Sequence, residues 1–386
     1  MNNFWLSLST DIYFGKGQVN VIGKLLKKAG AEKVLLAYGH GSIKKNNVYQ
    51  NIVKELESYS ISFIELSGID PNPRITTVRK GAEICKSNNI DFIIAAGAGS
   101  VIDCCKAIAA ARYYNGDPWD FFTRKASIKK ALPLCAVLTL AATGSEMNGG
   151  TVITNEKTKE KLSTGSLKIK PRFSILDPAY TFTVPKDQTA AGIADIMSHV
   201  FEQYFSYPES TILDHLSEAV LKTVIKYGPI AIEKPYDYEA RSQIMWSGTI
   251  ALNGLLGTGK DGDWATHLIE HEISAKYDIT HGVGLAILTP HWMRKVLNND
   301  NVERFAQYGR NVWGIEKKDL LETAEEAIDK TAYFFKSIGI PDKLSKLGID
   351  DSMFEEMAES CLKYNKIGRF KNLDRDDITE IYRNSL

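Results

Sequence analysis

Short apolar runs alternate with helix-like stretches through the first half of the chain, and this alternation constrains the fold more than any other feature. Residues 33–39, 62–68, 91–97 and 134–140 are apolar and strand-like, and amphipathic stretches separate them. Strands that alternate with helices predict a parallel sheet built from βαβ units. We therefore expect an α/β fold with a Rossmann-like, parallel-sheet domain at the N-terminus.

The alternation stops near residue 185. The segment DPAYTFTVP (177–185) is bracketed by Pro178 and Pro185, and helical periodicity follows it with few strand signals. Proline-rich junctions of this kind often separate structural units. The prediction is an α/β domain over residues 1–186 and an all-α domain over residues 187–386.

The overall charge narrows the class of partner. The chain has 47 basic and 47 acidic residues, so its formal net charge is zero. A chain without net charge has no long-range electrostatic field that would attract nucleic acid or an anionic membrane, so we do not expect these partners. We expect a small-molecule partner instead. No apolar run reaches the length of a membrane span, and the N-terminal residues do not have the pattern of a secretory signal. The five cysteines form no regular disulfide framework, so we expect a cytoplasmic protein.

Two glycine- and hydroxyl-rich turns follow predicted strands. In FIIAAGAGSVIDCCKAIAAAR (92–112), a buried strand leads through Gly97, Gly99 and Ser100 into a helix, and TLAATGSEMN (139–148) follows the next strand. Free backbone N–H groups and the positive end of a helix dipole suit a pyrophosphate. The first turn departs from the usual dinucleotide fingerprint because Ile102 stands where the third glycine is expected.

The segment GLLGTGK (254–260) has the spacing of a P-loop but not its context. Asp261 follows it in place of Ser or Thr, and the preceding residues are helix-like. A P-loop needs a feeding strand and a hydroxyl for magnesium, so an ATPase is not favoured.

A carboxylate and several histidines are spaced to bind a metal ion. Asp195 and His199 are four residues apart in a predicted helix, His267 and His271 repeat that spacing, and His281 follows. Residues four apart share one helix face. Imidazoles with a carboxylate suit Fe²⁺ or Zn²⁺ better than Mg²⁺ or Ca²⁺. An alternative is an inverted zinc peptidase, because HLIEH (267–271) fits its H-x-x-E-H motif and would make Glu270 the general base.

Taken together, these motifs resemble a known family. GAGSVIDCCK (97–106), TLAATGSE (139–146), GIADIMSH (192–199), HLIEH (267–271) and HG (281–282) resemble the iron-containing, group III alcohol dehydrogenases, in the branch of butanol dehydrogenases and NADPH-dependent aldehyde reductases. The resemblance extends over nearly the whole chain. It implies a dehydroquinate synthase-like arrangement of an α/β and a helical domain, and a homodimer.

The resemblance also implies roles for individual residues. The metal ligands are Asp195, His199, His267 and His281, and His271 is the catalytic candidate that relays a proton. The coenzyme pyrophosphate site is Gly97, Ala98, Gly99, Ser100 and Val101, where Ala98 replaces the glycine more usual in the family. Further coenzyme contacts are expected from Asn72, Asp103, Thr139, Thr143, Asn148, Lys161 and Tyr180.

The implied reaction is hydride transfer between NAD(P)H and small aliphatic aldehydes or alcohols. The metal ion would bind the substrate oxygen, and the nicotinamide would give or accept the hydride. A lyase similar to dehydroquinate synthase is the alternative of the same fold, but its polyanionic substrate needs a basic pocket. The aromatic and apolar stretches DWATHL and SHVFEQYF near the ligands favour small uncharged substrates instead.

The turn YGHGSIKK (38–45) bears on the choice of coenzyme. NAD-preferring dehydrogenases commonly place an acidic residue near this point, and this turn has none. Backbone N–H groups, a hydroxyl and an ammonium suit a phosphate dianion. We therefore expect NADP as the coenzyme, with NAD as the alternative, and the candidate contacts are Gly39, Gly41, Ser42, Lys44 and Lys45.

Overall fold

The computed structural model describes residues 1–363 and 366–386, and these residues form two compact units. The α/β unit comprises Ser7–Val184 and Pro235–Thr249, and the helical unit comprises Met1–Leu6, Pro185–Lys234 and Ile250–Leu386. The predicted junction at 186/187 lies next to the main change of unit at Val184 and Pro185. Two short segments, one at the N-terminus and one at 235–249, join the unit that their sequence position would not suggest.

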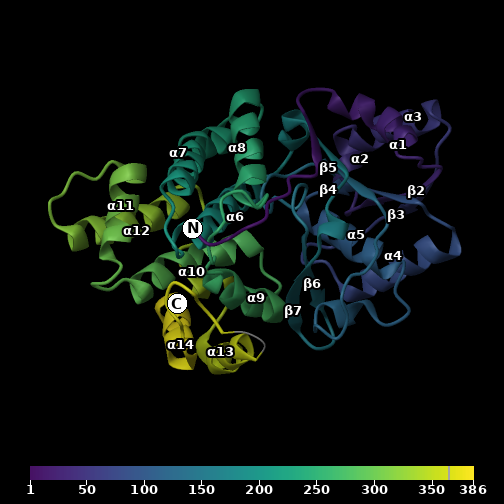
Figure 1. The fold of residues 1–386 in the computed structure, drawn as a ribbon. Helices are drawn as coiled ribbons and strands as arrows, with labels where there is room; N and C mark the ends of the chain where they lie inside the picture. Colours follow the sequence, from purple (N-terminus) through teal and green to yellow (C-terminus); the bar gives the residue numbers. More distant parts are fainter. Residues whose placement is uncertain (364–365) are drawn as a thin grey trace. The chain divides into compact units, whose positions relative to one another are not determined.

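The α/β unit is built on a parallel sheet whose strand order is β1-β8-β5-β4-β2-β3, beside an antiparallel β6-β7 hairpin (Figure 1). Its elements in chain order are β1 (Asp11–Phe14), η1 (Gln18–Val21), α1 (Ile22–Lys28), β2 (Lys33–Tyr38), α2 (Ser42–Lys45), α3 (Val48–Ser58), β3 (Ser62–Leu66), α4 (Ile75–Ser87), β4 (Phe92–Gly97), α5 (Gly99–Ala111), η2 (Pro118–Phe121), β5 (Leu134–Leu138), β6 (Gly150–Asn155), β7 (Glu160–Gly165), η3 (Leu167–Ile169), β8 (Phe173–Leu176), η4 (Pro178–Thr181) and most of α8 (Tyr238–Ala251).

Both faces of this sheet are covered by helices, as Figure 1 shows. Leu35 and Ala37 of β2 point into a core with α4 and α5, whereas Val34 and Leu36 point into a second core with α1 and α3. Successive side chains of a strand point to opposite faces, so a strand buried on both faces is apolar at every position. The four predicted strands therefore appear as β2, β3, β4 and β5.

The sequence prediction missed the remaining strands. β1 and β8 have only four residues each, and β6 and β7 form a partly exposed hairpin. Short strands lack the length over which an apolar run or an alternation becomes recognisable. The predicted fold class is nevertheless confirmed.

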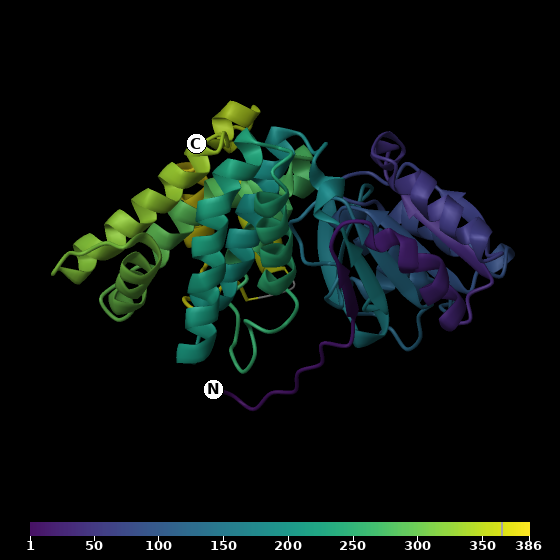
Figure 2. The same ribbon diagram turned by 90° about the horizontal axis from the view of Figure 1, so that it is seen from above.

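The helices of the helical unit are coloured from teal to yellow in Figure 2, and one of them is buried along most of its length. That helix is α6 (Lys186–Tyr204), whose residues from Thr189 to Tyr204 are all buried. A helix that is buried on every side lies inside a helical core. The other helical elements are α7 (Thr211–Glu233), α9 (Ala265–Tyr277), α10 (His281–Val296), α11 (Val302–Trp313), α12 (Leu320–Ser337), η5 (Leu344–Leu347), η6 (Asp351–Met353), α13 (Phe354–Leu362) and α14 (Arg375–Asn384). Among the described residues, no helix has both the length and the apolar character needed to cross a membrane.

Candidate metal centre and coenzyme-binding turns

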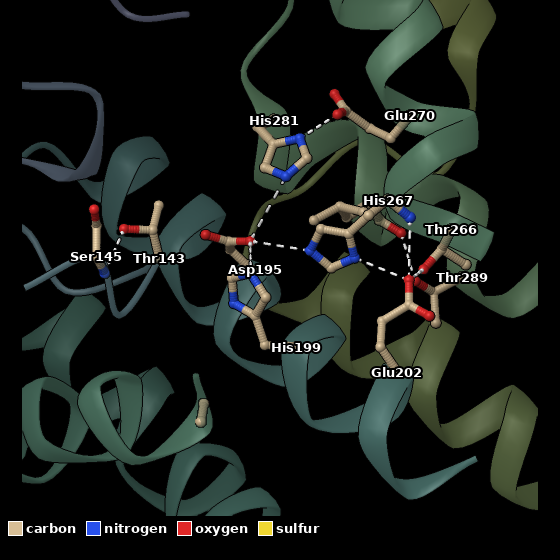
Figure 3. A network of polar contacts seen from close by, with 12 residues as sticks. Thr143, Ser145, Asp195, His199, Glu202, Thr266, His267, Glu270, His281 and Thr289 are labelled. Carbon is tan, nitrogen blue, oxygen red and sulfur yellow. Dashed lines mark hydrogen bonds and ion pairs between the residues drawn. The ribbon is translucent and has the colours of Figure 1, made fainter. Parts of the chain in front are cut away.

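Three helices of the helical unit bring the predicted metal ligands together. Asp195 and His199 lie one turn apart on α6, His267 lies on α9, and His281 is the first residue of α10. The Nε2 atoms of His199, His267 and His281 lie 3.6, 3.9 and 3.9 Å from Asp195 Oδ1 (Figure 3). Ligand atoms of a tetrahedral ion with bonds of about 2.1 Å are about 3.4 Å apart, so this spacing fits a single divalent ion.

The surroundings of His199 and His267 suit metal binding as well. Burial, and then the neighbouring His267 and His281 imidazoles, lower the pKa of His199 well below its ordinary value. A neutral imidazole is the form that ligates a metal. The Nε2 atom of His267 is buried and has no hydrogen-bond partner among residues 1–363 and 366–386. Since a buried polar nitrogen seldom stays unpaired, this atom also fits an ion.

Two carboxylates orient the imidazoles from behind. Glu202 Oε1 lies 2.9 Å from His267 Nδ1, and Glu270 accepts a hydrogen bond from His281 Nδ1 (Figure 3). Such a carboxylate holds the ring with Nε2 directed at the ion and makes the ligand more basic. The sequence analysis did not assign this role to either glutamate, and it considered Glu270 only as the base of a peptidase. Glu270 is fully buried and also accepts a hydrogen bond from Ser274.

His271 lies beside the ligand cluster. It is one helical turn beyond His267 on α9, and its ring centroid is 5.5 Å from that of His281. Ligand atoms of Glu270, His271 and His281 also lie within 4.8 Å of one another. The side chain is 7% exposed, so His271 is a nearly buried imidazole next to the candidate metal ligands.

In the α/β unit, the two glycine turns follow neighbouring strands. β4 pairs in parallel with β5, with Gly97 opposite Leu138, and the N–H of Thr139 donates to the Gly97 carbonyl (3.1 Å). A Cβ atom on Gly99 would lie 2.3 Å from Thr143 Oγ1, so only glycine allows this close approach. Ala98 precedes α5 with φ of −80°, so its methyl group causes no strain. Ligands of parallel α/β sheets bind at this edge, outside the carboxyl ends of the strands.

The other predicted coenzyme residues are distributed around these turns. Lys161 Nζ donates to Asn72 Oδ1 (3.0 Å), and both side chains are almost fully buried. The hydroxyl of Tyr180 accepts a hydrogen bond from Asn51 of α3 (3.4 Å). Asp103 is half-buried, and Ser145 Oγ and the N–H of Val152 donate to its carboxylate.

The turn after β2 lies beside the first glycine turn, because β2 and β4 are neighbouring parallel strands. The turn itself contains no acidic residue, but carboxylates from β3 and from the loop after it lie close to it. Asp70, from the loop after β3, is 2.8 Å from His40 Nε2, and Glu65 is 3.7 Å from Lys44 Nζ. The ammonium of Lys44 also lies over the rings of Tyr38 and Tyr49, at 5.1 and 4.5 Å from the centroids. The signal available in the sequence was Asp70 of the DPNP segment (70–73), which begins four residues after the end of β3.

Comparison with known proteins identifies the family. Residues 9–178 match the iron-containing alcohol dehydrogenases, and residues 189–386 match the C-terminal part of the Fe-containing alcohol dehydrogenase family. The chain is 52% identical to NADH-dependent butanol dehydrogenase A of Clostridium acetobutylicum over 100% of both chains. It is 37% identical to the NADPH-dependent aldehyde reductase YqhD of Escherichia coli over 99% of both.

A solved structure agrees with these matches. The crystal structure of NADH-dependent butanol dehydrogenase A from Thermotoga maritima superposes with a TM-score of 0.97 at 41% identity, covering 100% of this chain and 99% of that one. The match extends over both units of the chain, and the sequence motifs, the metal-type cluster and the glycine turns all agree with it. The chain belongs to the iron-containing alcohol dehydrogenase family.

Proposed function

We propose that this chain, an alcohol dehydrogenase of the iron-containing family, catalyses the metal-dependent interconversion of small aliphatic aldehydes and alcohols with NAD(P)H. In the direction of reduction, an aldehyde, NAD(P)H and a proton yield an alcohol and NAD(P)⁺. The observation that carries the proposal is the convergence of three imidazole Nε2 atoms on Asp195 Oδ1 at 3.6, 3.9 and 3.9 Å.

We propose Asp195, His199, His267 and His281 as the residues that hold the ion, which is Fe²⁺ or Zn²⁺. An ion bound there supplies Lewis acidity at the substrate oxygen. One carboxylate and three neutral imidazoles leave a net charge of about +1, which favours a negative oxygen over a neutral one. Glu202 and Glu270 keep His267 and His281 in the orientation that ligation needs.

We propose His271 as the residue that carries the proton. It is nearly buried beside His281 and is not needed to complete the set of four ligands. An imidazole gains and loses a proton near neutral pH and therefore suits a relay.

The aromatic surroundings of the ligands support small uncharged substrates. The Trp264 ring lies edge-on to His267, with centroids 5.3 Å apart, and its centroid is 6.4 Å from that of His199. An indole beside the ligands offers apolar surface and no cation for a polyanionic substrate. Family membership and this environment favour the dehydrogenase over the lyase and peptidase alternatives.

For the coenzyme, we propose that the turns after β2, β4 and β5 bind the dinucleotide. NADPH remains the sequence-based prediction, with NADH as the alternative. NADH-dependent and NADPH-dependent enzymes both occur among the relatives at 52% and 37% identity. A homodimer and a cytoplasmic location are further proposals that rest on the family resemblance and the sequence.

Reconstitution of the metal-free enzyme tests the function. Anaerobically purified protein is stripped with a chelator, and butanal reduction is then measured with NADH and NADPH after addition of Fe²⁺ or Zn²⁺. We expect the stripped enzyme to lose turnover but still bind coenzyme, and either ion to restore activity. A metal-free enzyme that reduces aldehydes at the full rate would overturn the proposal.

Matched histidine variants locate the ion. His199→Ala should lose bound metal and activity together, because three remaining ligands hold the ion weakly. His271→Ala should keep the metal but turn over more slowly, with a changed pH profile. His215→Ala is the control, since His215 lies on the exposed face of α7 in the same unit. Metal loss in His271→Ala equal to that in His199→Ala would place His271 among the ligands instead.

A further inference from the structure

A buried lysine on α5 makes contacts that the reaction described above does not use. Lys106 is fully buried, and its Nζ atom donates to Ser145 Oγ (2.8 Å), Asn148 Oδ1 (2.9 Å) and the Gly150 carbonyl (2.8 Å). An ammonium group has three N–H donors. Each donor therefore has one acceptor, and all of these acceptors lie in the second glycine turn or at its end.

Asn148 extends these contacts into the turn itself. Its Nδ2 atom donates to the carbonyls of Thr143 (3.3 Å) and Gly144 (2.9 Å), and its Oδ1 accepts from the N–H of Gly150 (2.9 Å). Because Lys106 fixes the Oδ1 end of this amide, it also determines which way the Nδ2 end points. Segment 143–150 is thus folded around the Lys106 ammonium.

Asp103, one turn earlier on α5, completes a charged network. Its carboxylate accepts hydrogen bonds from Ser145 Oγ and from the N–H of Val152 (2.8 Å). The Ser145 hydroxyl accepts from Lys106 and donates to Asp103, so its proton has one favoured orientation. Burial lowers the pKa of Lys106 to about 8 and raises that of Asp103. A charged group as deeply buried as the Lys106 ammonium is retained only when it is paired and hydrogen-bonded.

The second turn also shapes the first. Thr143 packs so closely against Gly99 that an added Cβ atom would lie 2.3 Å from Thr143 Oγ1. Any displacement of Thr143 therefore changes the space beside Gly97–Val101, where free N–H groups at the start of α5 suit a pyrophosphate. Gly99 and Lys106 both lie on α5 (Gly99–Ala111). This helix therefore contacts the second turn twice, through Gly99 against Thr143 and through Lys106 against Ser145.

We propose that Lys106 is a positioning residue for the nicotinamide coenzyme, which holds segment 143–150 against the glycine turn 97–101 in the conformation that binds the dinucleotide. The inference rests on the proposed use of NAD(P)H. A buried ionic network contributes little to stability compared with apolar packing of the same volume. We therefore attribute the presence of this network to its role in specifying one conformation of the turns. The coenzyme does not need to touch Lys106 for this role.

Direct coenzyme binding tests the inference. NADH and NADPH are titrated into full-length wild-type protein, Lys106→Met, Lys106→Arg and Ser145→Ala, and binding is followed by quenching of tryptophan fluorescence. Lys106→Met should weaken binding about tenfold or more, the cost of leaving buried acceptors without a donor. Ser145→Ala should weaken it less, and Lys106→Arg should restore part of the affinity. In turnover, the KM for coenzyme should rise while bound metal and the KM for butanal stay unchanged.

Cys105→Ala is the matched control for a general loss of stability. Cys105 is the residue before Lys106 on α5, and its fully buried side chain belongs to the apolar core of α4, α5 and the sheet. We expect it to lower the Tm but leave the coenzyme Kd unchanged.

Two results would overturn the inference. One is wild-type coenzyme affinity in both Lys106→Met and Ser145→Ala. The other is a loss of coenzyme affinity in Cys105→Ala equal to that in Lys106→Met at the same drop in Tm. If Lys106→Met does not fold, the coenzyme Kd of Ser145→Ala tests the inference in its place. A wild type that binds NADH but reduces no aldehyde would contradict the proposed function and leave this inference intact.

Discussion

The contacts of single residues at the turn after β2 bear on the choice of coenzyme. In the proposed complex with NADPH, Ser42 and the exposed Lys45 would donate to the 2′-phosphate. Asp70 lies 2.8 Å from His40 Nε2, and its carboxylate would repel that phosphate. The loop that contains Asp70 is tied to the turn, because the N–H groups of Gly68 and Ile69 donate to the carbonyls of Gly39 (3.0 Å) and Tyr38 (3.3 Å). Substitutions here should therefore shift the coenzyme preference without changing hydride transfer.

Two substitutions should move that preference in opposite directions. Gly39→Asp should lower kcat/KM for NADPH relative to NADH by at least about tenfold, because like charges placed side by side repel. Asp70→Asn should raise the same ratio by up to about fivefold, the scale of an exposed charge interaction. The measurement is the ratio of the two kcat/KM values. A ratio that is unchanged in Asp70→Asn would show that this carboxylate does not act on the ribose.

Among the elements, α7 and α11 are joined by a buried ion pair that also reaches the end of α6. Asp214 of α7 accepts two hydrogen bonds from Arg304 of α11, each 2.7 Å long, and one from Lys260 (2.6 Å). Arg304 donates to the Tyr204 carbonyl, at the last residue of α6 (2.6 Å). Because α6 carries Asp195 and His199, this cluster supports the helix on which the candidate metal ligands lie.

The Asp214 cluster should make stability pH-dependent. Burial alone would raise the pKa of Asp214, but the hydrogen bonds from Arg304 and Lys260 outweigh it and lower the pKa below its ordinary value. The stabilisation is therefore present above the unfolded pKa of about 4 and is lost as the pH falls through the folded pKa. At pH 7, Asp214→Asn should lower the free energy of unfolding by about 3–5 kcal/mol.

Denaturant unfolding at several pH values measures this effect. The difference in free energy of unfolding between wild type and Asp214→Asn should shrink below a pH of about 4, where the Asp214 carboxylate of the unfolded chain begins to take up a proton. Asp329→Asn is the control, because its partner Arg294 and the carboxylate itself are exposed, and such pairs contribute about 0–1 kcal/mol. If Asp214→Asn lowers the free energy of unfolding by the same amount from pH 7 to pH 3, the Asp214 carboxylate is not the source of the pH dependence.

At the scale of the whole molecule, neither compact unit is a single continuous stretch of the sequence. Residues 235–249 come after the first helices of the helical unit, yet they belong to the α/β unit. Thr249 Oγ1 donates to the buried Glu146 carboxylate (2.5 Å), and the Trp246 ring lies 6.0 Å from that of Phe14. A fragment that ends at residue 186 would leave Glu146 without this hydrogen bond.

Fragments test this view of the α/β unit. Residues 7–184 alone should unfold at a lower temperature than the same residues joined by a flexible linker to residues 235–249. The physical reason is the loss of the Thr249 hydrogen bond and of the apolar surface that α8 covers. Equal Tm values for the two fragments would show that the segment adds nothing to the unit.

The sequence by itself determined the features that depend on local periodicity. The apolar runs of β2 to β5 predicted a parallel sheet, because strands buried on both faces must be apolar at every position. The four-residue spacing of Asp195 with His199, and of His267 with His271, predicted which side chains share a helix face. The resemblance to the family then separated His281, as a ligand, from His271.

Only the tertiary structure decided which distant side chains meet. Glu202 is 65 residues from His267, Asp70 is 30 residues from His40, and Lys106 is 39 residues from Ser145. No local pattern encodes these pairs, because each depends on how strands and helices from separate parts of the chain pack. The side chains that could ligate a metal were thus readable from the sequence, whereas the groups that orient them, and the lysine that we propose to position the coenzyme turns, became visible only once the chain was folded.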